Sequence, residues 1–558
     1  MSPASRLMGS RGVNVGVLMK TRLTSVMSAA TLIAWIALAF LVQPVYAASS
    51  TSSDLAKIDS FIRAQLDESR IPGLALGIVQ GDQIVHLQGF GKADDSGRAV
   101  TPQTPFLIGS NSKSFTALAV MQLVEAGSIR LDAPIHKYLP WFRVADPSAS
   151  AMITVRQLLN QTSGLSTNTG RSLLVGSETG TLEQAVRNLR TEAIVSPVGT
   201  SYNYSNANYM ILGLLVQTIS QEPYGDYIEQ HIFRPLDMSH SFTSQDRARR
   251  ADLATGYRYW FGLPVAFDAP YLAAALPAGG LISTAEDMTH YLAMYLGGGT
   301  YHGRALLSAN GIAQMERPPS QTADTNYGMG WATGTVGGVN VIWHSGDEPA
   351  FHAGMVLVPN GGWGIIVLEN VNSGNPLVAS QIRVLENGVT RLLAGDQGTT
   401  GTGIGTVYLL FDLVVLIVIA VQIWSLVRLL RRRSRPELPL RGLLHALSQG
   451  RQWVLPLLWE IGVPVAIWLG LPYQADASWG VLLLFAPDLS AAVLVVAGLF
   501  LLTGLVRVVI AGLSHSRQRQ PRVSGMKPHV DRRVAEVQRL TASLTASPGD
   551  SVTHQHTR

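Results

Sequence analysis

The apolar positions between residues 54 and 394 change period several times, as they do in a domain that mixes helices with strands. Helical spacing joins five apolar residues at the start of this region: Leu55, Ile58, Phe61, Ile62 and Leu66. Two strands are predicted next, around a turn at Gly81-Asp82: Leu74–Val79 and Gln83–Gln88. The region therefore opens with one amphipathic helix and a hairpin.

The middle and the end of the same region predict further elements. A helix with mostly apolar positions is expected over Asn111–Ala126, where Gly127 ends it. Three strands are expected near the end: Val339–His344, Ala350–Val358 and Trp363–Leu368. A last helix follows over Leu377–Leu393. Strands at both ends with helices between them predict an α+β domain over residues 54–394, with a sheet completed by its two termini.

The C-terminal third consists of long apolar runs. Three of them are long enough to cross a hydrocarbon core of about 30 Å: Val407–Leu430, Trp453–Tyr473 and Leu489–Leu513. Charged residues make up 14% of the chain and its mean hydropathy is +0.21. An average soluble chain carries about 25% charge. The composition therefore agrees with three transmembrane helices over 407–513 and a basic tail over 514–558.

Arginines flank these runs unevenly. Six lie between the first run and the second: Arg431, Arg432, Arg433, Arg435, Arg441 and Arg451. Between the second run and the third, the only charged residues are Asp476 and Asp488. The tail again holds several arginines, such as Arg517 and Arg519. Because positive loops stay in the cytoplasm, we expect the first loop and the tail inside and the domain outside.

The N-terminal segment, residues 1–47, predicts export. Basic residues precede an apolar run, Met27–Val42, and Val45-Tyr46-Ala47 is typical of a signal cleavage site. Met19 is an alternative start, and an uncleaved membrane anchor is the alternative reading of the run. Residues 48–53 form a Ser/Thr linker and residues 395–406 a Gly/Thr linker. The expected location is the bacterial cytoplasmic membrane, with several spans and an extracytoplasmic domain.

Four charged residues lie inside the predicted spans. Asp412 lies near an outer end, and Arg428 and Arg507 are expected to extend their long side chains to the inner interface. Glu460 lies deeper, so it is a candidate for a packing or partner role. The spans also offer a surface to a partner membrane protein.

The composition excludes several kinds of chemistry. With no cysteine, the chain has no disulfide, thiol nucleophile, Cys-ligated zinc or iron–sulfur cluster. It has no Gly-x-Ser-x-Gly, which argues against an α/β-hydrolase, and no His-Glu-x-x-His, which argues against a zinc peptidase. We expect no metal and no cofactor. The basic tail is explained by membrane sidedness and anionic lipid, so nucleic acid is not an expected partner.

One short motif predicts nucleophilic chemistry. In Ser110-Asn-Ser-Lys113 the serine and the lysine share one face of a helix that begins there. Free backbone N–H groups at the start of a helix stabilise an oxyanion. A lysine with a depressed pKa can take the serine proton, whereas an arginine cannot. A second match, Ser524-Gly-Met-Lys527 in the tail, is read as coincidence.

Two further motifs follow in a characteristic order. Tyr204-Ser-Asn206 comes about a hundred residues later, and His344-Ser-Gly346 lies near the domain end, with a second His-x-Gly at His352-Ala-Gly354. With the supporting stretch Tyr327-Gly-Met-Gly-Trp331, the set resembles the serine β-lactamase and penicillin-binding protein superfamily, in its class C-like branch. The resemblance implies an antiparallel sheet flanked by helices, together with a helical subdomain.

The resemblance also implies roles for individual residues. Ser110 would be the acylated nucleophile and Lys113 its activating partner. Tyr204 would act as general base and then as proton donor to the leaving group. Substrate would be bound through four residues: Asn206, His344, Gly346 and Asp347. The backbone N–H groups of Ser110 and of Asp347 would form the oxyanion hole.

The third motif departs from the Lys-Thr-Gly that efficient class C β-lactamases usually carry. A histidine at position 344 is charged only part of the time at neutral pH, so peptidase or esterase activity is favoured over antibiotic hydrolysis. The expected substrates are small D-amino-acid-containing peptides or β-lactam-like molecules. The three spans also resemble peptidases that remove an N-acyl-D-amino-acid cap from natural products. A non-enzymatic alternative is a sensor of cell-wall peptides.

Overall fold

The computed structural model describes five stretches of the chain: residues 52–172, 180–319, 325–396, 403–432 and 443–519. The expected export segment, residues 48–51 and 397–402 of the two linkers, the tail beyond residue 519 and the second Ser-x-x-Lys lie outside the described residues. The chain divides into two compact units. One holds everything up to Val414 together with Leu471–Ala492, and the other holds Val415–Gly470 and Val493–Arg558.

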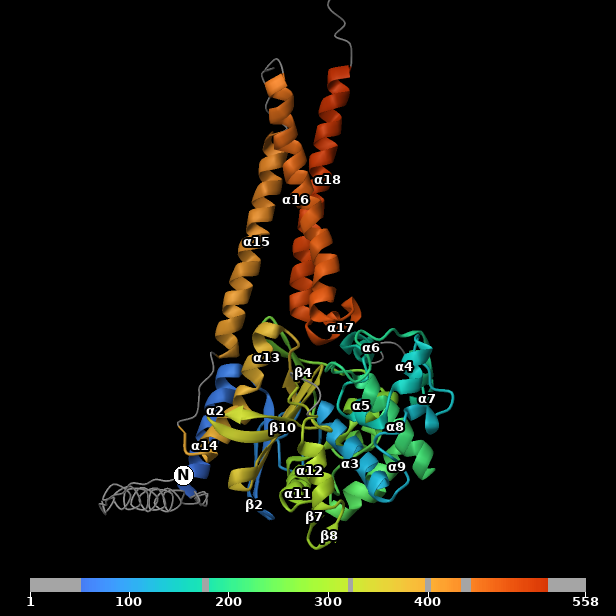
Figure 1. Cartoon of the computed structure of the whole chain (residues 1–558). Coiled ribbons are helices and arrows are strands. Elements are labelled where there is room, and N and C mark those ends of the chain that lie inside the picture. The colour runs from blue at the N-terminus through green and yellow to red at the C-terminus, as the bar shows by residue number, and fades with distance from the viewer. Residues whose placement is uncertain (1–51, 173–179, 320–324, 397–402, 433–442, 520–558) are drawn as a thin grey trace, which may run out of the picture. The chain divides into compact units, whose positions relative to one another are not determined.

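A six-stranded antiparallel sheet forms the centre of the first unit (Figure 1). In spatial order its strands are β2 (Gln83–Gly91), β1 (Gly73–Gln80), β12 (Trp363–Glu369), β11 (Phe351–Val358), β10 (Val339–Glu348) and β9 (Ala332–Val336). Strand β1 pairs with β12, so N-terminal and C-terminal strands share one sheet. The α+β prediction of a sheet completed by both termini is confirmed.

The burial of each strand follows its place in the sheet. Strands β11 and β12 have apolar residues on both faces and every position buried, because helices cover both sides. Strand β2 lies at one edge and is partly exposed along most of its length. Short strands form small additional sheets: β3 (Phe106–Leu107) with β6 (Ile282–Ser283), β4 (Tyr257–Trp260) with β5 (Leu263–Ala266) and β13 (Val371–Asn372), and β7 (Thr300–Tyr301) with β8 (Arg304–Ala305).

The helices from the two ends of the domain pack against one face of the sheet. Helix α2 (Ser52–Ser69) buries the apolar stripe that predicted it, with Ile58 and Ile62 fully buried. The helix predicted over 377–393 is instead two helices, α13 (Pro376–Ile382) and α14 (Val384–Leu393). Proline at the start of α13 and the Asn375 cap fix its beginning, and Arg383 separates the two helices.

The opposite face carries α11 (Ala285–Leu296) and the helical subdomain. The central helix α3 (Ser112–Glu125) is surrounded by other helices, and its first ten residues are all buried. It contacts α8 (Asn206–Ser220), α9 (Tyr224–Ile228) and α12 (Ala309–Glu316), and both α5 (Val155–Leu159) and α7 (Leu182–Asn188) pack on α8. Three helices of six residues lie elsewhere in this unit: α4 (Pro147–Met152), α6 (Thr167–Ser172) and α10 (Gln245–Arg250). The buried helix α3 therefore begins within the Ser110-Asn-Ser-Lys113 motif.

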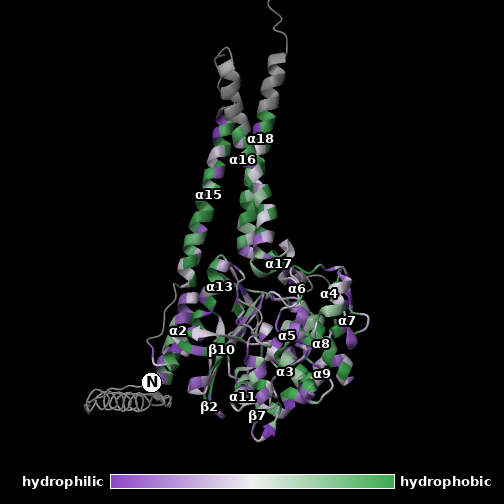
Figure 2. Cartoon of the chain, viewed as in Figure 1, coloured by the Kyte–Doolittle hydropathy of each residue, from purple (hydrophilic) through white to green (hydrophobic). Residues whose placement is uncertain are grey.

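Three long apolar helices follow: α15 (Ile404–Arg432), α16 (Leu443–Ala475) and α18 (Pro487–Arg519). All three are long and apolar enough to cross a membrane, and Figure 2 shows them as largely hydrophobic. A short helix that the sequence did not predict, α17 (Trp479–Phe485), lies between the last two. It belongs to the first compact unit, where the Gly374 N–H donates to the carbonyl of Phe485 at 2.7 Å.

Within the second unit, Glu460 of α16 and Arg507 of α18 form a bidentate ion pair. Arg507 Nε donates to Glu460 Oε2 at 2.8 Å, and its Nη2 donates to Oε1 at 2.6 Å. The partner role for Glu460 is thus observed. The expectation that Arg507 extends to the interface is wrong, because its guanidinium is bound to this carboxylate between the helices.

We expect Glu460→Gln to destabilise the helical unit by about 3–5 kcal/mol, because it leaves the Arg507 charge buried without its counter-ion. Replacing both residues with leucine should recover most of that loss. The measurement is denaturant unfolding of the full chain in detergent micelles. Asp412→Asn is the matched control, because Asp412 forms no ion pair among the described residues. An equal loss in the double variant would contradict this account.

Candidate active site

Ser110 lies in a tight turn, η1 (Gly109–Asn111), that runs directly into α3. Lys113, in the first turn of α3, donates a hydrogen bond from Nζ to Ser110 Oγ at 2.9 Å. The prediction that these two side chains share one face is confirmed. Gly109 has a φ of +51°, and a Cβ on it would lie 2.8 Å from the backbone nitrogen of Asp347. Glycine is therefore required where the turn meets strand β10.

The amine of Lys113 is completely buried and has three partners. Besides Ser110, Nζ donates to Asn206 Oδ1 at 2.7 Å and to the Ala278 carbonyl at 2.6 Å. Burial lowers the pKa of Lys113 to about 7, although the nearby Glu348 carboxylate acts in the opposite direction. Near neutral pH the group therefore exists in both its charged and its neutral form. A neutral amine keeps two donors and gains a lone pair.

Tyr204 lies just before α8 and completes the group around the serine. Its phenol interacts with the hydroxyl of Ser110, and its ring centroid lies 4.9 Å from Lys113 Nζ. Burial raises the pKa of Tyr204 well above its ordinary value. The phenol therefore stays protonated at neutral pH, where it can donate or relay a proton. Of these two groups, Lys113 is the one whose pKa matches neutral pH.

His344 lies on β10 and is buried, with both ring nitrogens engaged. Nδ1 lies 2.8 Å from the Ser345 carbonyl, so it carries the hydrogen, and Nε2 lies 3.1 Å from the hydroxyl of Tyr327 and accepts from it. Burial, helped by the charge of Lys113, lowers the pKa of His344 to about 3. The histidine is therefore neutral at physiological pH and supplies no fixed positive charge here.

Strand β10, which carries His344-Ser-Gly346, lies against the turn η1 that holds Ser110. Strand β9 pairs with β10 only as far as Trp343, so the following residues of β10 have a free edge on that side among the described residues. A Cβ on Gly346 would lie 1.9 Å from the Ile108 carbonyl oxygen and 2.9 Å from the Ser110 nitrogen. Only glycine permits this approach, which brings the backbone of Asp347 next to that of Ser110.

The side chain of Asp347 serves a different purpose from its backbone. Its carboxylate lies 2.8 Å from His352 Nδ1 and 3.2 Å from Asn372 Nδ2, and Arg383 reaches it at 3.5 Å. The carboxylate is thus held by strand β11 and by the segment between α13 and α14. By holding the side chain of Asp347, these contacts also fix the position of its backbone.

Glu348 is a part of this region that the sequence analysis missed. Its carboxylate lies near Gly279, where an added Cβ would come within 2.8 Å of Oε1. Burial raises the pKa of Glu348 to about 8, against the effect of the Lys113 charge. No motif marks this residue, and its only sequence signal is a second acidic residue directly after His-Ser-Gly-Asp.

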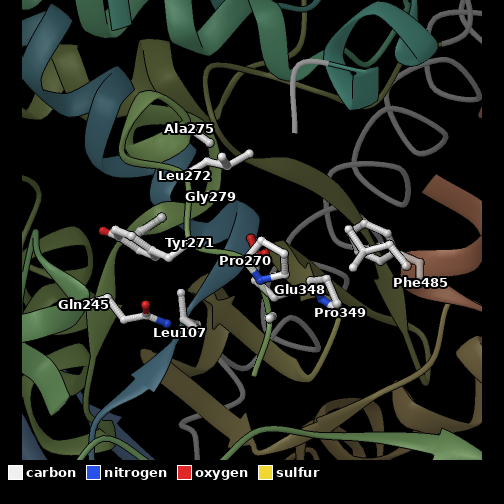
Figure 3. A pocket seen from close by; sticks show the side chains of 13 residues that line it. Leu107, Gln245, Pro270, Tyr271, Leu272, Ala275, Gly279, Glu348, Pro349 and Phe485 are labelled. Carbon is white, nitrogen blue, oxygen red and sulfur yellow. The ribbon is translucent and has the colours of Figure 1, made fainter. Parts of the chain in front are cut away.

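A narrow cavity of about 40 Å³ adjoins these groups (Figure 3). Its walls are mainly apolar and include Leu107, Tyr271, Leu272 and Pro349, with Glu348 among them. Helix α17 contributes Phe485. Because Gly279 lines the cavity and follows the carbonyl that binds Lys113, the cavity lies beside the catalytic candidates rather than on them.

Residues 58–389, more than half of the chain, match the family model described as Beta-lactamase. The chain belongs to the Beta-lactamase family. The resemblance drawn from the three motifs is therefore confirmed, as is the β-lactamase and penicillin-binding protein fold with its antiparallel sheet and helices. The family makes a serine hydrolase the expected class of protein.

Individual relatives are distant. Penicillin-binding protein 4 of Amycolatopsis lactamdurans is 30% identical over 315 residues, covering 54% of this chain and 82% of its own. Protein flp of Staphylococcus aureus strain MW2 is 28% identical over 325 residues, which are 58% of this chain and 64% of its own length. The octameric penicillin-binding protein homologue from Pyrococcus abyssi superposes with a TM-score of 0.55 at 28% identity, over 62% of this chain and 78% of that one.

Proposed function

We propose that the chain is a serine hydrolase that forms an acyl-enzyme at Ser110, on the outer face of a bacterial cytoplasmic membrane. One observation carries this proposal: the 2.9 Å hydrogen bond between Lys113 Nζ and Ser110 Oγ, at an amine whose pKa burial lowers to about 7. A buried lysine with this pKa serves as a proton acceptor at neutral pH. It belongs to a Beta-lactamase-family domain, in which a serine hydrolase is expected.

Acylation begins at the neutral amine of Lys113. It donates to Asn206 and to the Ala278 carbonyl, and its lone pair takes the proton of the Ser110 hydroxyl as Oγ attacks the substrate carbonyl carbon. The backbone N–H groups of Ser110 and Asp347 donate to the developing oxyanion. The proton then passes through the phenol of Tyr204 to the leaving group as the carbon–leaving-group bond breaks. An ester on Ser110 remains.

Deacylation reverses these proton movements with water in place of the serine hydroxyl. Lys113 and Tyr204 take a proton from the water as its oxygen attacks the ester carbonyl. The same N–H groups hold the second oxyanion. When it collapses, the carboxylic acid product leaves and the proton returns to Ser110 Oγ. This assignment gives Lys113 the role of first acceptor and Tyr204 that of relay, because the high pKa of the phenol favours its protonated form.

Small D-amino-acid-containing peptides are the proposed substrates, as amides. A neutral His344 gives no fixed cation for the carboxylate of a β-lactam, which favours peptidase over antibiotic hydrolysis. The similarity to a protein named penicillin-binding protein 4 supports the same class. The apolar cavity beside Glu348 suits a substrate with a small apolar group. Removal of an N-acyl-D-amino-acid cap, ester hydrolysis and β-lactam hydrolysis are alternatives within the same chemistry.

The proposed organisation is an export segment over 1–47, a catalytic domain over 54–394, three spans over 407–513 and a cytoplasmic tail. Positive charge between the first two spans supports this orientation. The connection between the second and third spans, within Leu471–Ala492, belongs to the same compact unit as the domain. That grouping agrees with the domain and this connection lying on one side of the membrane.

The test is covalent labelling of membranes that contain the full chain, with a fluorescent penicillin and with a fluorophosphonate. We expect wild type to be labelled by at least one probe, and Ser110→Ala and Lys113→Ala to lose the label. Ser524→Ala is the matched control, because it removes the serine of the other Ser-x-x-Lys, and it should label as wild type does. Peptide mass spectrometry should place the adduct on Ser110.

Two results would overturn the proposal. Wild type that is present in membranes but takes neither probe would favour the non-enzymatic alternative, a sensor of cell-wall peptides. An adduct on another serine, retained in Ser110→Ala, would place the nucleophile elsewhere. Hydrolysis of D-amino-acid peptides, compared with N-acylated peptides and β-lactams, then separates the substrate classes.

A further inference from the structure

Three side chains of types that can bind a metal ion meet inside the domain, next to β10, the strand that borders Ser110. His352 comes from β11, Glu369 from the end of β12 and Glu386 from α14. His352 and Glu369 are direct cross-strand partners in the β11–β12 register. One ligand atom from each of the three lies within 4.8 Å of the others. Two of the three residues lie on paired strands, and the third lies on a helix that packs against those strands, so the cluster is held rigidly.

The polar atoms of this cluster lack the partners that burial demands. Glu369 is 0% exposed, and neither of its carboxylate oxygens has a hydrogen-bond partner among the described residues. The same is true of Glu386 Oε2 and of Nε2 of His352, a residue that is also 0% exposed. Buried polar atoms almost always have partners, and buried charges are paired or bind metals. Glu369 points into the cluster with both oxygens unsatisfied.

The hydrogen bond on the other side of His352 orients its ring for ligation. Nδ1 lies 2.8 Å from Asp347 Oδ1, so it is the nitrogen that carries the hydrogen when the ring is neutral. The lone pair is then on Nε2, which faces the two glutamates. A carboxylate that accepts from one ring nitrogen while the other binds a metal is a common arrangement around zinc.

The spacing and the charges also fit a divalent cation. His352 Nε2 lies 3.6 Å from Glu386 Oε1, beyond hydrogen-bond range. Ligand atoms about 2.1 Å from one tetrahedral ion lie about 3.4 Å apart, close to this separation. Arg383 pairs with Asp347, and among the described residues no arginine or lysine forms an ion pair with Glu369 or Glu386. A divalent cation would supply positive charge to these two carboxylates.

We propose that His352 Nε2 and the carboxylates of Glu369 and Glu386 bind one divalent transition-metal ion, with Zn²⁺ as the preferred ion. One imidazole and two carboxylates form a donor set that suits zinc, and the chain has no cysteine to compete for it. The sequence analysis expected no metal, because the three ligands are separated along the chain and form no spacing motif.

The ion would have a structural role. It would link β11, β12 and α14, and through the His352–Asp347 hydrogen bond it would hold the part of β10 that borders Ser110. The second His-x-Gly of the sequence, His352-Ala-Gly354, then has a function of its own as the site of a ligand. This inference rests on the fold and does not depend on the proposed hydrolase activity.

The test measures metal content of the full chain, purified in detergent with a tag that contains no histidine, after incubation with ZnCl₂ and desalting. We expect about one zinc per chain, falling at least about tenfold in Glu369→Gln. Glu316→Gln is the matched control, because Glu316 is a partly buried carboxylate outside the cluster, and it should keep the zinc. Chelation should lower the melting temperature of wild type but not that of Glu369→Gln, and zinc should restore it.

X-ray absorption of the wild-type protein keeps the proposal testable if Glu369→Gln does not fold. It should show a first shell of nitrogen and oxygen ligands at about 2.0–2.2 Å without sulfur, and the outer-shell scattering of one imidazole ring. Wild type that takes up no zinc and whose melting temperature is indifferent to zinc would overturn the proposal. So would a folded Glu369→Gln that keeps its metal.

Discussion

Replacing Lys113 with methionine is expected to lower kcat/KM for acylation by on the order of 10³- to 10⁴-fold at pH 7.5. The methionine fills the buried space but cannot take the proton of Ser110, which the amine contacts at 2.9 Å. Stopped-flow acylation with a chromogenic ester substrate measures the loss. Lys113→Arg should be as inactive, because a guanidinium does not lose its proton in the accessible pH range.

The expected pH dependence of acylation by the wild-type protein follows from the same group. Burial lowers the pKa of Lys113 to about 7, so the fraction of neutral amine rises through neutral pH. We expect kcat/KM to rise with pH to a plateau above about 8, with a midpoint near 7. His344 should not contribute a limb in this range, because its pKa is lowered to about 3.

The pH dependence of the free energy of unfolding supplies the control for this assignment. The folded pKa of Lys113 lies below its ordinary value of 10.5. Between pH 7 and 10.5 the unfolded chain therefore binds more protons, and the free energy of unfolding rises with pH. Lys113→Met should lose that rise while remaining folded, whereas Lys137→Met, at an exposed position, should keep both the rise and full activity. Activity within tenfold of wild type in Lys113→Met would contradict the assigned role.

Much of the fold could be predicted because its elements carry local signals. Apolar alternation marks the first hairpin, and nearly continuous apolar runs mark β11 and β12, which lie in the middle of the sheet. The pairing of Ser110 with Lys113 could be predicted because the two residues are three apart at the start of a helix, and their side chains lie 2.9 Å apart. The three long apolar helices follow from length and hydropathy alone.

The parts that the sequence analysis missed depend on contacts between distant segments. Glu348 meets the nucleophile region only because the loop around Gly279 folds against β10. The cluster of His352, Glu369 and Glu386 exists only once two strands and a helix pack together. The sequence of its own span places Arg507 at the interface, whereas its partner Glu460 lies on another helix. No local pattern encodes such pairings.

Gly346→Ala is the second large effect that we expect, a fall in kcat on the order of 10²- to 10³-fold. The added Cβ would lie 1.9 Å from the Ile108 carbonyl oxygen, so β10 must move away from the nucleophile turn by about an ångström or more to accept it. That movement separates the backbone N–H of Asp347 from that of Ser110. Because these groups bind the oxyanion only as it forms, KM should change much less than kcat.

Gly334→Ala on the neighbouring strand β9 is the matched control for this substitution. A Cβ there meets only the Trp343 side chain, at 3.3 Å, which can shift by a few tenths of an ångström. We expect near wild-type kcat in that variant, and circular dichroism should show that both variants are folded. A folded Gly346→Ala with unchanged kcat would show that the Asp347 N–H does not stabilise the transition state. The approach of β10 to Ser110 would then be a packing requirement alone.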